Sequence, residues 1–358
     1  MEGVPAESGQ PRRRRREASI DDVARRAGVS GQTVSRVANG RDNVGAATRE
    51  RVLAAMKELG YRPNSAARAL RSGQFRSIGV IVFTLTSYGN LRTLEAVAAA
   101  ATERRYAITL MPLTRPTHAD VSAALDRLGE QAVDGVVVLI ESNLIGTAEA
   151  QLHRGTPVVV VDSRAAGRSA VVDTDQFMGA RLATEHLLEL GHDTVRHVAG
   201  PRDSYSAGLR LRGWRETLLA HGRPVPEPVH GDWYSDSGYD AGRRFAADPG
   251  LSAVFAANDQ MALGVLRALA EAHRRVPEDV SVVGFDDMPE ARNFIPPLTT
   301  VHQDFAAVGR TAVDALVQEI EGGRTAESTE IAPRLVVRGS TGRPAGHRRV
   351  TSAPASGG

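Results

Sequence analysis

Residues 20–40 read IDDVARRAGVSGQTVSRVANG, and they hold two short helical patterns with a tight connector between them. Ser19 and Asp22 have the spacing of a capping box, and Gly28 ends the first pattern where a helix favours a left-handed residue. Ser30 is of the residue type that begins a helix, and valines three residues apart follow it. The stretch therefore predicts two short helices joined by a tight turn.

A third helical pattern over 48–59 ends at Gly60 and completes a small unit, which we place at 18–62. The second helix of this unit presents a polar face. Glutamine and arginine on such a face can pair with adenine and guanine in the major groove, and hydroxyl groups can bind phosphates. This pattern is typical of a helix-turn-helix that binds double-stranded DNA, and the candidate contacts are Ser30, Gln32, Thr33, Ser35, Arg36 and Asn39. A helical bundle with a merely solvated polar face is the competing interpretation.

The charge of the chain is divided unevenly. Residues 1–75 carry 15 basic and 8 acidic side chains, a net charge of +7, whereas the remaining residues carry 29 and 34, a net charge of −5. A basic module ahead of a mildly acidic body indicates that only the front of the chain meets a polyanion. Residues 1–17, with the run Arg12–Arg16, read as a disordered basic tail, and both phosphate contact and plain solvation fit that run.

Several classes of function are excluded by residues that the chain lacks. It has no cysteine, which excludes disulfides, thiolate nucleophiles and Cys-ligated metal sites, and Lys57 is its sole lysine. The large C-terminal part therefore has neither a P-loop lysine nor a Schiff-base lysine. We expect no metal site, no cofactor and no enzymatic activity. Since no apolar segment follows the arginine run and none approaches the ~20 residues of a membrane span, we expect a soluble cytoplasmic protein without a membrane partner.

Residues 63–75 separate the small unit from the body. Pro63 cannot continue a helix, and the polar, alanine-rich segment 64–71 has good helix propensity but little to bury. We expect a conditional hinge helix there, followed by a short linker.

From residue 77 onward, short Val/Ile-rich runs alternate with helical patterns. These runs cover 78–83, 107–113, 135–140, 157–162, 195–200, 253–256 and 280–285. Unbroken apolar strands separated by helices indicate parallel sheets buried on both faces, and the strands are too many for one ordinary sheet. The late segments 298–304 and 335–339 look like crossovers and closing strands. We therefore predict an α/β fold with two doubly wound lobes over 76–340.

The two predicted lobes enclose a cleft. We assign 76–174 and 305–332 to one lobe and 175–302 and 333–340 to the other, and we expect a disordered tail over 341–358. Ligands of doubly wound sheets bind at the carboxyl ends of the strands. The polar residues near strand ends, which we expect to face the cleft, are Asp162, Asn258, Asp286 and Asp287.

The stretch 20–40, together with TRERVLAAMKELGYRPNSAARAL over 48–70, resembles the headpiece of LacI/GalR transcription repressors. The resemblance continues through the body to about Gly339. It implies a helix-turn-helix headpiece joined to a two-lobed, periplasmic-binding-protein-like (type I) core, and a repressor whose hold on operator DNA is controlled by a small molecule. It also implies that Gln32 and Arg36 read bases and that Leu70 enters the minor groove, with Ala67 beside it and Asn64 as a further contact. Where a galactoside-responsive member of the family has tyrosine, this chain has Gly31, so the operator sequence cannot be carried over.

The resemblance also implies a sugar pocket. Four residues match those that hold sugar hydroxyls in the family, namely Asp162, Arg210, Asn258 and Asp286, and Arg115, Trp233, Gln303 and Phe305 match the pocket lining. Carboxylates, an amide and a guanidinium can satisfy sugar hydroxyls individually, and an indole offers a flat apolar face. Phe83 and Ser87 depart from the galactoside-responsive pattern at the first strand. We therefore expect a ligand with a galactoside-like core, and these positions do not specify the rest of the ligand.

Four alternatives stand beside a sugar-induced repressor. The effector could act as a corepressor, or the protein could be an activator; a sugar-binding transport protein would instead carry a signal peptide and lack the helix-turn-helix. A glycosidase would need a protonated carboxyl, and we expect Arg210 to lower the pKa of a neighbouring carboxyl.

Because no leucine heptads follow Gly339, we predict a homodimer and not a tetramer.

Overall fold

The computed structural model describes residues 18–38, 43–61, 73–113, 117–139, 156–162, 169–322 and 327–344. The chain divides into two compact units, Met1–Phe75 and Arg76–Gly358, which we treat separately. Several predictions lie outside the described residues: the basic tail over 1–17, most of the hinge over 63–75, and the candidate contacts Asn39, Asn64, Ala67, Leu70 and Arg115.

The first unit holds three helices, α1 (Ile20–Ala27), α2 (Gly31–Ala38) and α3 (Ala46–Leu59). The capping box of Ser19 and Asp22 is formed, and Gly28 takes φ 65° at the end of α1, where only a residue tolerant of left-handed backbone fits cheaply. The three helices bury a small apolar core of Val23, Ala24, Ala27, Val34, Val37, Val52, Ala55 and Met56. This core fixes the angle between α1 and α2.

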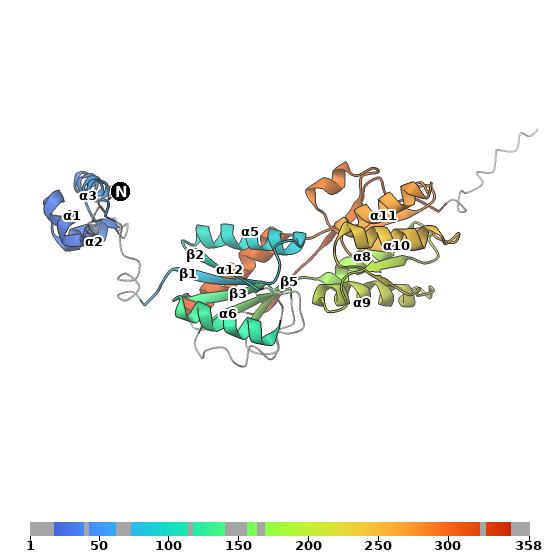
Figure 1. Cartoon of the computed structure of the whole chain (residues 1–358), viewed down its shortest axis with the longest axis horizontal. Helices are drawn as coiled ribbons and strands as arrows, with labels where there is room; N and C mark the ends of the chain where they lie inside the picture. Colours follow the sequence, from blue (N-terminus) through green and yellow to red (C-terminus); the bar gives the residue numbers. More distant parts are fainter. Residues whose placement is uncertain are drawn as a thin grey trace, which may run out of the picture. The chain divides into compact units, whose positions relative to one another are not determined.

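The first lobe of the second unit is a six-stranded parallel sheet with the strand order β11-β5-β4-β3-β1-β2. Helices α5 and α12 pack on one face and α6 on the other (Figure 1). The elements are β1 (Ser77–Val82), α5 (Tyr88–Glu103), β2 (Ala107–Pro112), α6 (His118–Glu130), β3 (Gly135–Leu139), β4 (Val158–Val161), β5 (Ala170–Thr174), α12 (Phe305–Gly322) and β11 (Thr329–Ile331). The central strands β1, β3 and β4 are buried on both faces, which explains their continuous apolar runs, whereas the edge strands β2 and β11 are partly exposed.

The second lobe repeats this plan with the strand order β12-β10-β9-β8-β6-β7, and only β12 is antiparallel to its neighbour. Helices α8 and α9 cover one face, and α10 and α11 cover the other. The elements are α8 (Gln176–Glu189), β6 (Arg196–Ala199), α9 (Tyr205–Ala220), β7 (Val229–His230), α10 (Ser235–Ala246), β8 (Ala253–Ala256), α11 (Asp259–Glu271), β9 (Ser281–Asp286), the 3-10 helix η2 (Pro289–Asn293), β10 (Thr299–His302) and β12 (Arg334–Val336). Helices α10 and α11 approach closely at Gly264, which has no side chain. A Cβ atom there would lie 2.0 Å from the Ser235 carbonyl oxygen.

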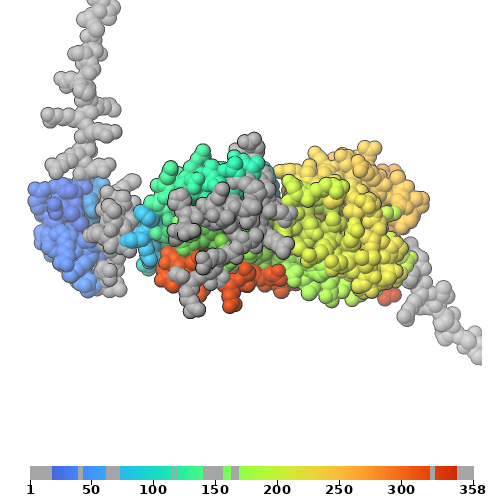
Figure 2. Space-filling view, turned by 90° about the horizontal axis from the view of Figure 1, so that it is seen from below, coloured from blue at the N-terminus to red at the C-terminus, as the bar shows by residue number. Residues whose placement is uncertain are grey.

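The chain crosses between the lobes at β5–α8, at β10–α12 and at β11–β12. As a consequence, segments late in the chain pack in the first lobe. Figure 2 shows orange-red atoms of the late chain beside the teal and green atoms of that lobe. The predicted α/β fold with two parallel-sheet lobes is confirmed. No valine run had indicated β5, β7 or β11, which are short or end in polar residues. In the part of the chain that the structure describes, no helix is long and apolar enough to cross a membrane.

We expected a disordered tail from residue 341 onward, but the structure describes residues 341–344. The Thr341 hydroxyl lies 3.0 Å from Nε2 of His186, and the Gly342 N–H donates to the Ser281 hydroxyl at 3.0 Å. These bonds satisfy polar groups of α8 and β9, so residues 341 and 342 contact the second lobe. The other predicted boundaries stay predictions.

Candidate functional site

The first candidate site is the exposed face of α2. Gln32 and Arg36 are exposed on it, while Thr33 and Ser35 are half-buried. The Ser30 hydroxyl accepts a hydrogen bond from the Thr33 N–H at 3.2 Å and lies 3.0 Å from the Thr33 hydroxyl, so this pair also begins the helix. The two longest polar side chains therefore stand on the outer face of α2, and their contacts with DNA stay a prediction.

The second candidate site is a pocket between the two lobes of the second unit. It encloses about 460 Å³ of space not filled by atoms, including its opening to solvent. Eight of the residues predicted from the sequence line it: Ser87, Asp162, Arg210, Trp233, Asn258, Asp286, Gln303 and Phe305. Phe83, which directly follows β1, does not line it.

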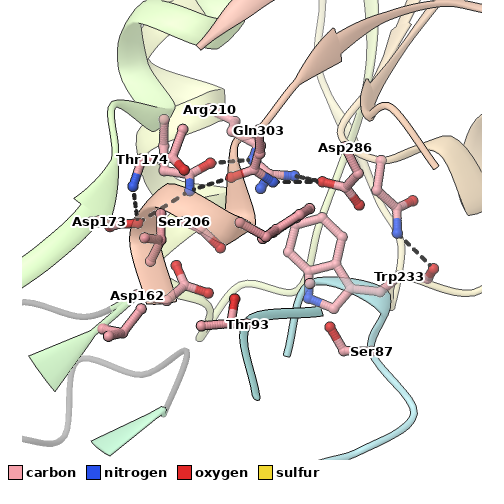
Figure 3. Close-up of a pocket in the computed structure, with 16 residues that line it drawn as sticks. Ser87, Thr93, Asp162, Asp173, Thr174, Ser206, Arg210, Trp233, Asp286 and Gln303 are labelled. Atoms are coloured by element: carbon pink, nitrogen blue, oxygen red, sulfur yellow. Dashed lines mark hydrogen bonds and ion pairs between the residues drawn. The ribbon is translucent and has the colours of Figure 1, made fainter. Parts of the chain in front are cut away.

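Further lining residues escaped the sequence reasoning, above all Asp173, Thr174, Gln176 and Ser206. The strand-end rule that selected Asp162 could also have found Asp173, had β5 been recognised as a strand. The register of β4 and β5 pairs Val161 with Val172, so the two aspartates directly follow paired residues on neighbouring strands. Figure 3 shows both on one side of the pocket, with Trp233 and Asp286 on the opposite side.

Three residues of the pocket have left-handed backbone although they carry side chains. Their φ angles are 58° for Asp162, 76° for Trp233 and 110° for Asp286. Such conformations cost roughly 1–3 kcal/mol each and persist only where the surrounding fold holds them. The turns aim these side chains into the pocket, which is a common arrangement at binding sites.

Arg210, on α9, lines the pocket and is 5% exposed. Its Nε donates to Oε1 of Gln176 at 2.8 Å, its Nη1 donates to the Ala257 carbonyl, and Nη1 lies 3.6 Å from Oδ1 of Asp286. Its guanidinium carbon also lies 5.4 Å from the centre of the Trp233 ring. Several partners therefore fix the guanidinium in one orientation.

Asn258 serves the fold and the pocket together. Its Oδ1 accepts a hydrogen bond from the Met261 N–H at 2.8 Å, which begins α11, and its Nδ2 donates to the Trp233 carbonyl at 2.9 Å. Trp233 also needs Gly200, because a Cβ atom there would lie 2.4 Å from the indole ring. The turn that carries the indole is thus tied to the start of α11.

Two buried carboxyl groups of the second unit, Asp173 and Asp259, have raised pKa values. Burial raises the pKa of Asp173 to about 7, against hydrogen bonds from Gln176 and the Thr174 N–H and against the charge of Arg210. Burial, and then the negative charge of Asp286, raise the pKa of Asp259 well above its usual range. Arg210 lowers the pKa of Asp173, as expected, but desolvation outweighs the guanidinium, so the net pKa of this carboxyl is raised.

Asp287 was expected to face the cleft and does not line the pocket. Its Oδ1 binds Nη2 of Arg338 at 2.5 Å, and its Oδ2 lies 2.9 Å from Nδ1 of His302. The backbone turns between the two aspartates, so only Asp286 points into the pocket. Among the described residues, no group of three or more His, Asp or Glu side chains is placed to hold a metal ion.

A separate helix-turn-helix unit and a two-lobed body with a polar pocket define a class, that of ligand-controlled DNA-binding regulators. Residues 19–64 match the family model of bacterial regulatory proteins, lacI family, and residues 184–341 match a periplasmic binding protein-like domain. The chain belongs to the LacI family of transcriptional regulators.

Individual relatives agree with this assignment. The chain is 36% identical to the lactose operon repressor of Escherichia coli (strain K12), over 90% of each chain. It is 34% identical to the ribose operon repressor of the same strain, over 90% of this chain and 99% of the other. A crystal structure of the lac repressor dimer bound to operator and an anti-inducer matches with a TM-score of 0.83 and 34% identity, over 91% of this chain and 100% of the other. These relatives are transcriptional regulators.

Proposed function

We propose that the chain is a dimeric repressor that binds operator DNA and is released from it by a small, galactoside-like sugar. The observation that carries this proposal is the convergence of Asp162, Arg210, Asn258 and Asp286 on one pocket beside the Trp233 indole. Each sugar hydroxyl both donates and accepts hydrogen bonds, so a set of carboxylates, an amide and a guanidinium matches it. The indole offers a flat face to the C–H surface of the ring.

The pocket supports control of DNA binding because it is built from both lobes. Asp162 and Ser87 come from the first lobe, whereas Arg210, Trp233 and Asp286 come from the second. A ligand that contacts both lobes binds best at one angle between them, and such differential binding is what shifts an equilibrium between two states. We propose that the angle favoured by the sugar is the one that weakens operator binding.

The DNA-binding part of the proposal rests on Gln32 and Arg36 on the exposed face of α2. A helix-turn-helix reads two half-sites as a two-fold dimer, and the lac repressor structure that this chain resembles is described as a dimer bound to operator. We propose the same assembly here. A molecular mass of two chains in light scattering agrees with this proposal, and a stable monomer or tetramer at micromolar concentration contradicts it.

A galactoside-like ligand is proposed because the family resemblance of the sequence implies that the four polar residues hold sugar hydroxyls, and the chain is 36% identical to the lactose operon repressor. The chain is also 34% identical to the ribose operon repressor, so the test includes ribose. The test is a thermal-shift panel of galactose, lactose, glucose, ribose, cellobiose and hypoxanthine with the full-length protein. A ligand present at one hundred times its Kd adds about 2.7 kcal/mol to the free energy of unfolding, enough to raise Tm by several degrees. We expect galactose or lactose to give the largest shift.

The same panel is then repeated with DNA. A duplex selected by the protein from a randomised pool should bind tightly without sugar and dissociate when the stabilising sugar is added. Trp233→Phe should lose most of the sugar-induced change in tryptophan emission, whereas Trp214→Phe should keep it, because Trp214 is fully buried in the second lobe. Stabilisation by hypoxanthine alone, or tighter DNA binding with sugar, contradicts the proposed inducer.

A further inference from the structure

A closed ring of four buried polar side chains lines part of the pocket. Arg210 Nε donates to Gln176 Oε1 at 2.8 Å, Gln176 Nε2 donates to Gln303 Oε1 at 3.0 Å, and Gln303 Nε2 donates to Asp286 Oδ1 at 2.7 Å. The ion pair of Asp286 with Arg210, at 3.6 Å, closes the ring. All four residues are less than 7% exposed, so water does not compete with these bonds.

The ring joins the segments that cross between the lobes. Gln176 is the first residue of α8, immediately after the first crossing, and Gln303 directly follows β10 at the second crossing. Gln176 Nε2 also lies 3.3 Å from Oδ1 of Asp173, at the end of a strand of the first lobe. One amide therefore contacts both crossing segments, the first lobe, and the ligand-facing Arg210.

The hydrogen bonds of the ring can run in one direction only. Arginine has donors and no acceptor, so the carbonyl oxygen of Gln176 must face Arg210 and its NH2 group must face Gln303. The carbonyl oxygen of Gln303 is thereby occupied, and its NH2 group faces the Asp286 carboxylate. Turning either amide around would place two oxygens against each other without a proton between them.

We propose that Gln176 is a positioning residue, whose amide orients Arg210 and Gln303 toward the pocket and ties both to the two crossing segments. The inference rests on the proposed function in taking these two side chains to face the effector. Gln176 links Arg210 to Gln303, and its loss removes the bond that holds one edge of the Arg210 guanidinium and the bond that the Gln303 carbonyl oxygen accepts.

The first test needs no ligand. Full-length Gln176→Met keeps the length of the side chain and removes its hydrogen bonds, and Gln318→Met on an exposed position of α12 is the matched control. Hydrogen exchange is measured for peptides that cover 174–180 and 300–308. We expect exchange at least ten-fold faster in both segments of Gln176→Met and no change in the control. Unchanged exchange in both segments overturns the proposal.

The second test uses pH and also serves if Gln176→Met does not fold. In Gln176→Glu the introduced carboxylate still accepts from Arg210, but its other oxygen faces the Gln303 carbonyl and Asp173. Once protonated, the carboxyl can donate and restores the direction of the ring. The charged groups around it are Arg210 from α9, Asp173 from β5, Asp286 from β9 and, more distantly, Glu330 from β11. Exchange in Gln176→Glu should match wild type at pH 5.5 and be faster at pH 8, after correction for the intrinsic pH dependence of exchange. A wild-type-corrected rate that does not change with pH contradicts a positioning role.

The third test adds the sugar that stabilises wild-type protein most in the panel above. Gln176→Met should raise the Kd for that sugar at least ten-fold, while Gln318→Met should not change it. Equal affinity in the two variants overturns the proposal. If no sugar binds wild-type protein, the proposed function fails, and the two ligand-free tests still decide the role of Gln176.

Discussion

Asp173→Asn should change how the stability of the second unit depends on pH. Burial raises the pKa of this carboxyl from 3.8 to about 7, so between these values the folded protein binds a proton that the unfolded chain has released. The free energy of unfolding of the wild type must therefore fall as the pH rises through this window, and the full cost is present above about pH 7. Asparagine cannot ionise, yet its oxygen can still accept from the Thr174 N–H and from Gln176.

The size of the effect follows from the same shift. One proton gives a slope of at most ~1.4 kcal/mol per pH unit, and the whole shift corresponds to at most about 4 kcal/mol. Asp259 acts in the same direction but is present in both proteins, so it cancels in the difference. Only the part of the shift above pH 5 falls within the measured range, so relative to wild type the variant should gain between about 1 and 3 kcal/mol from pH 5 to pH 8.

Urea unfolding at pH 5, 6, 7 and 8 measures this difference. The emission of Trp214, which is fully buried, and far-UV circular dichroism follow the transition. Asp193→Asn is the control, because the side chain of Asp193 is 84% exposed and its neutralisation should leave the slope unchanged. If wild type and Asp173→Asn keep a constant difference in unfolding free energy from pH 5 to 8, burial does not hold this carboxyl protonated and the reasoning is refuted.

Three further predictions concern other parts of the molecule. Arg36→Ala should weaken binding to the selected duplex by about 1–3 kcal/mol but weaken binding to random DNA much less, as titrations on both duplexes will show; equal losses would remove it as a base reader. Gly200→Ala should shift the emission of Trp233 in the ligand-free protein and weaken sugar binding, because the new methyl group takes space that the indole occupies; an unchanged spectrum and affinity would contradict that packing. Gly264→Ala should destabilise the protein by several kcal/mol, since backbone atoms of α10 lie where the new methyl group would be. Gly208→Ala, on an open face of α9, should stabilise the protein by up to about 1 kcal/mol. Similar melting temperatures of the two variants would contradict the close helix contact.

The sequence predicts the two sheets well because buried parallel strands leave continuous valine runs such as 158–161. It also predicts Asp162 and Asp286, which directly follow or end such runs. It misses Asp173 because β5 reads AVVDT, a run too short and too polar to stand out. The role of Gln176 could not be predicted at all, since its three partners lie 3, 34 and 127 residues away and only the fold brings them together.

The positions of glycine show which constraint governs the pocket. Where two elements must approach closely, as at Gly200 and Gly264, the chain has glycine in ordinary backbone. Where the pocket requires left-handed backbone, glycine would be cheaper, yet the chain has Asp162, Trp233 and Asp286. Of the five other left-handed residues with side chains in the described part, three, Arg105, Ala132 and His273, directly follow the C-cap of a helix, where this conformation is common. The strained turns of the pocket have no such local cause. We therefore infer that these three side chains are retained for what they contact in the pocket, and that the two buried sheets supply the stability that holds them there.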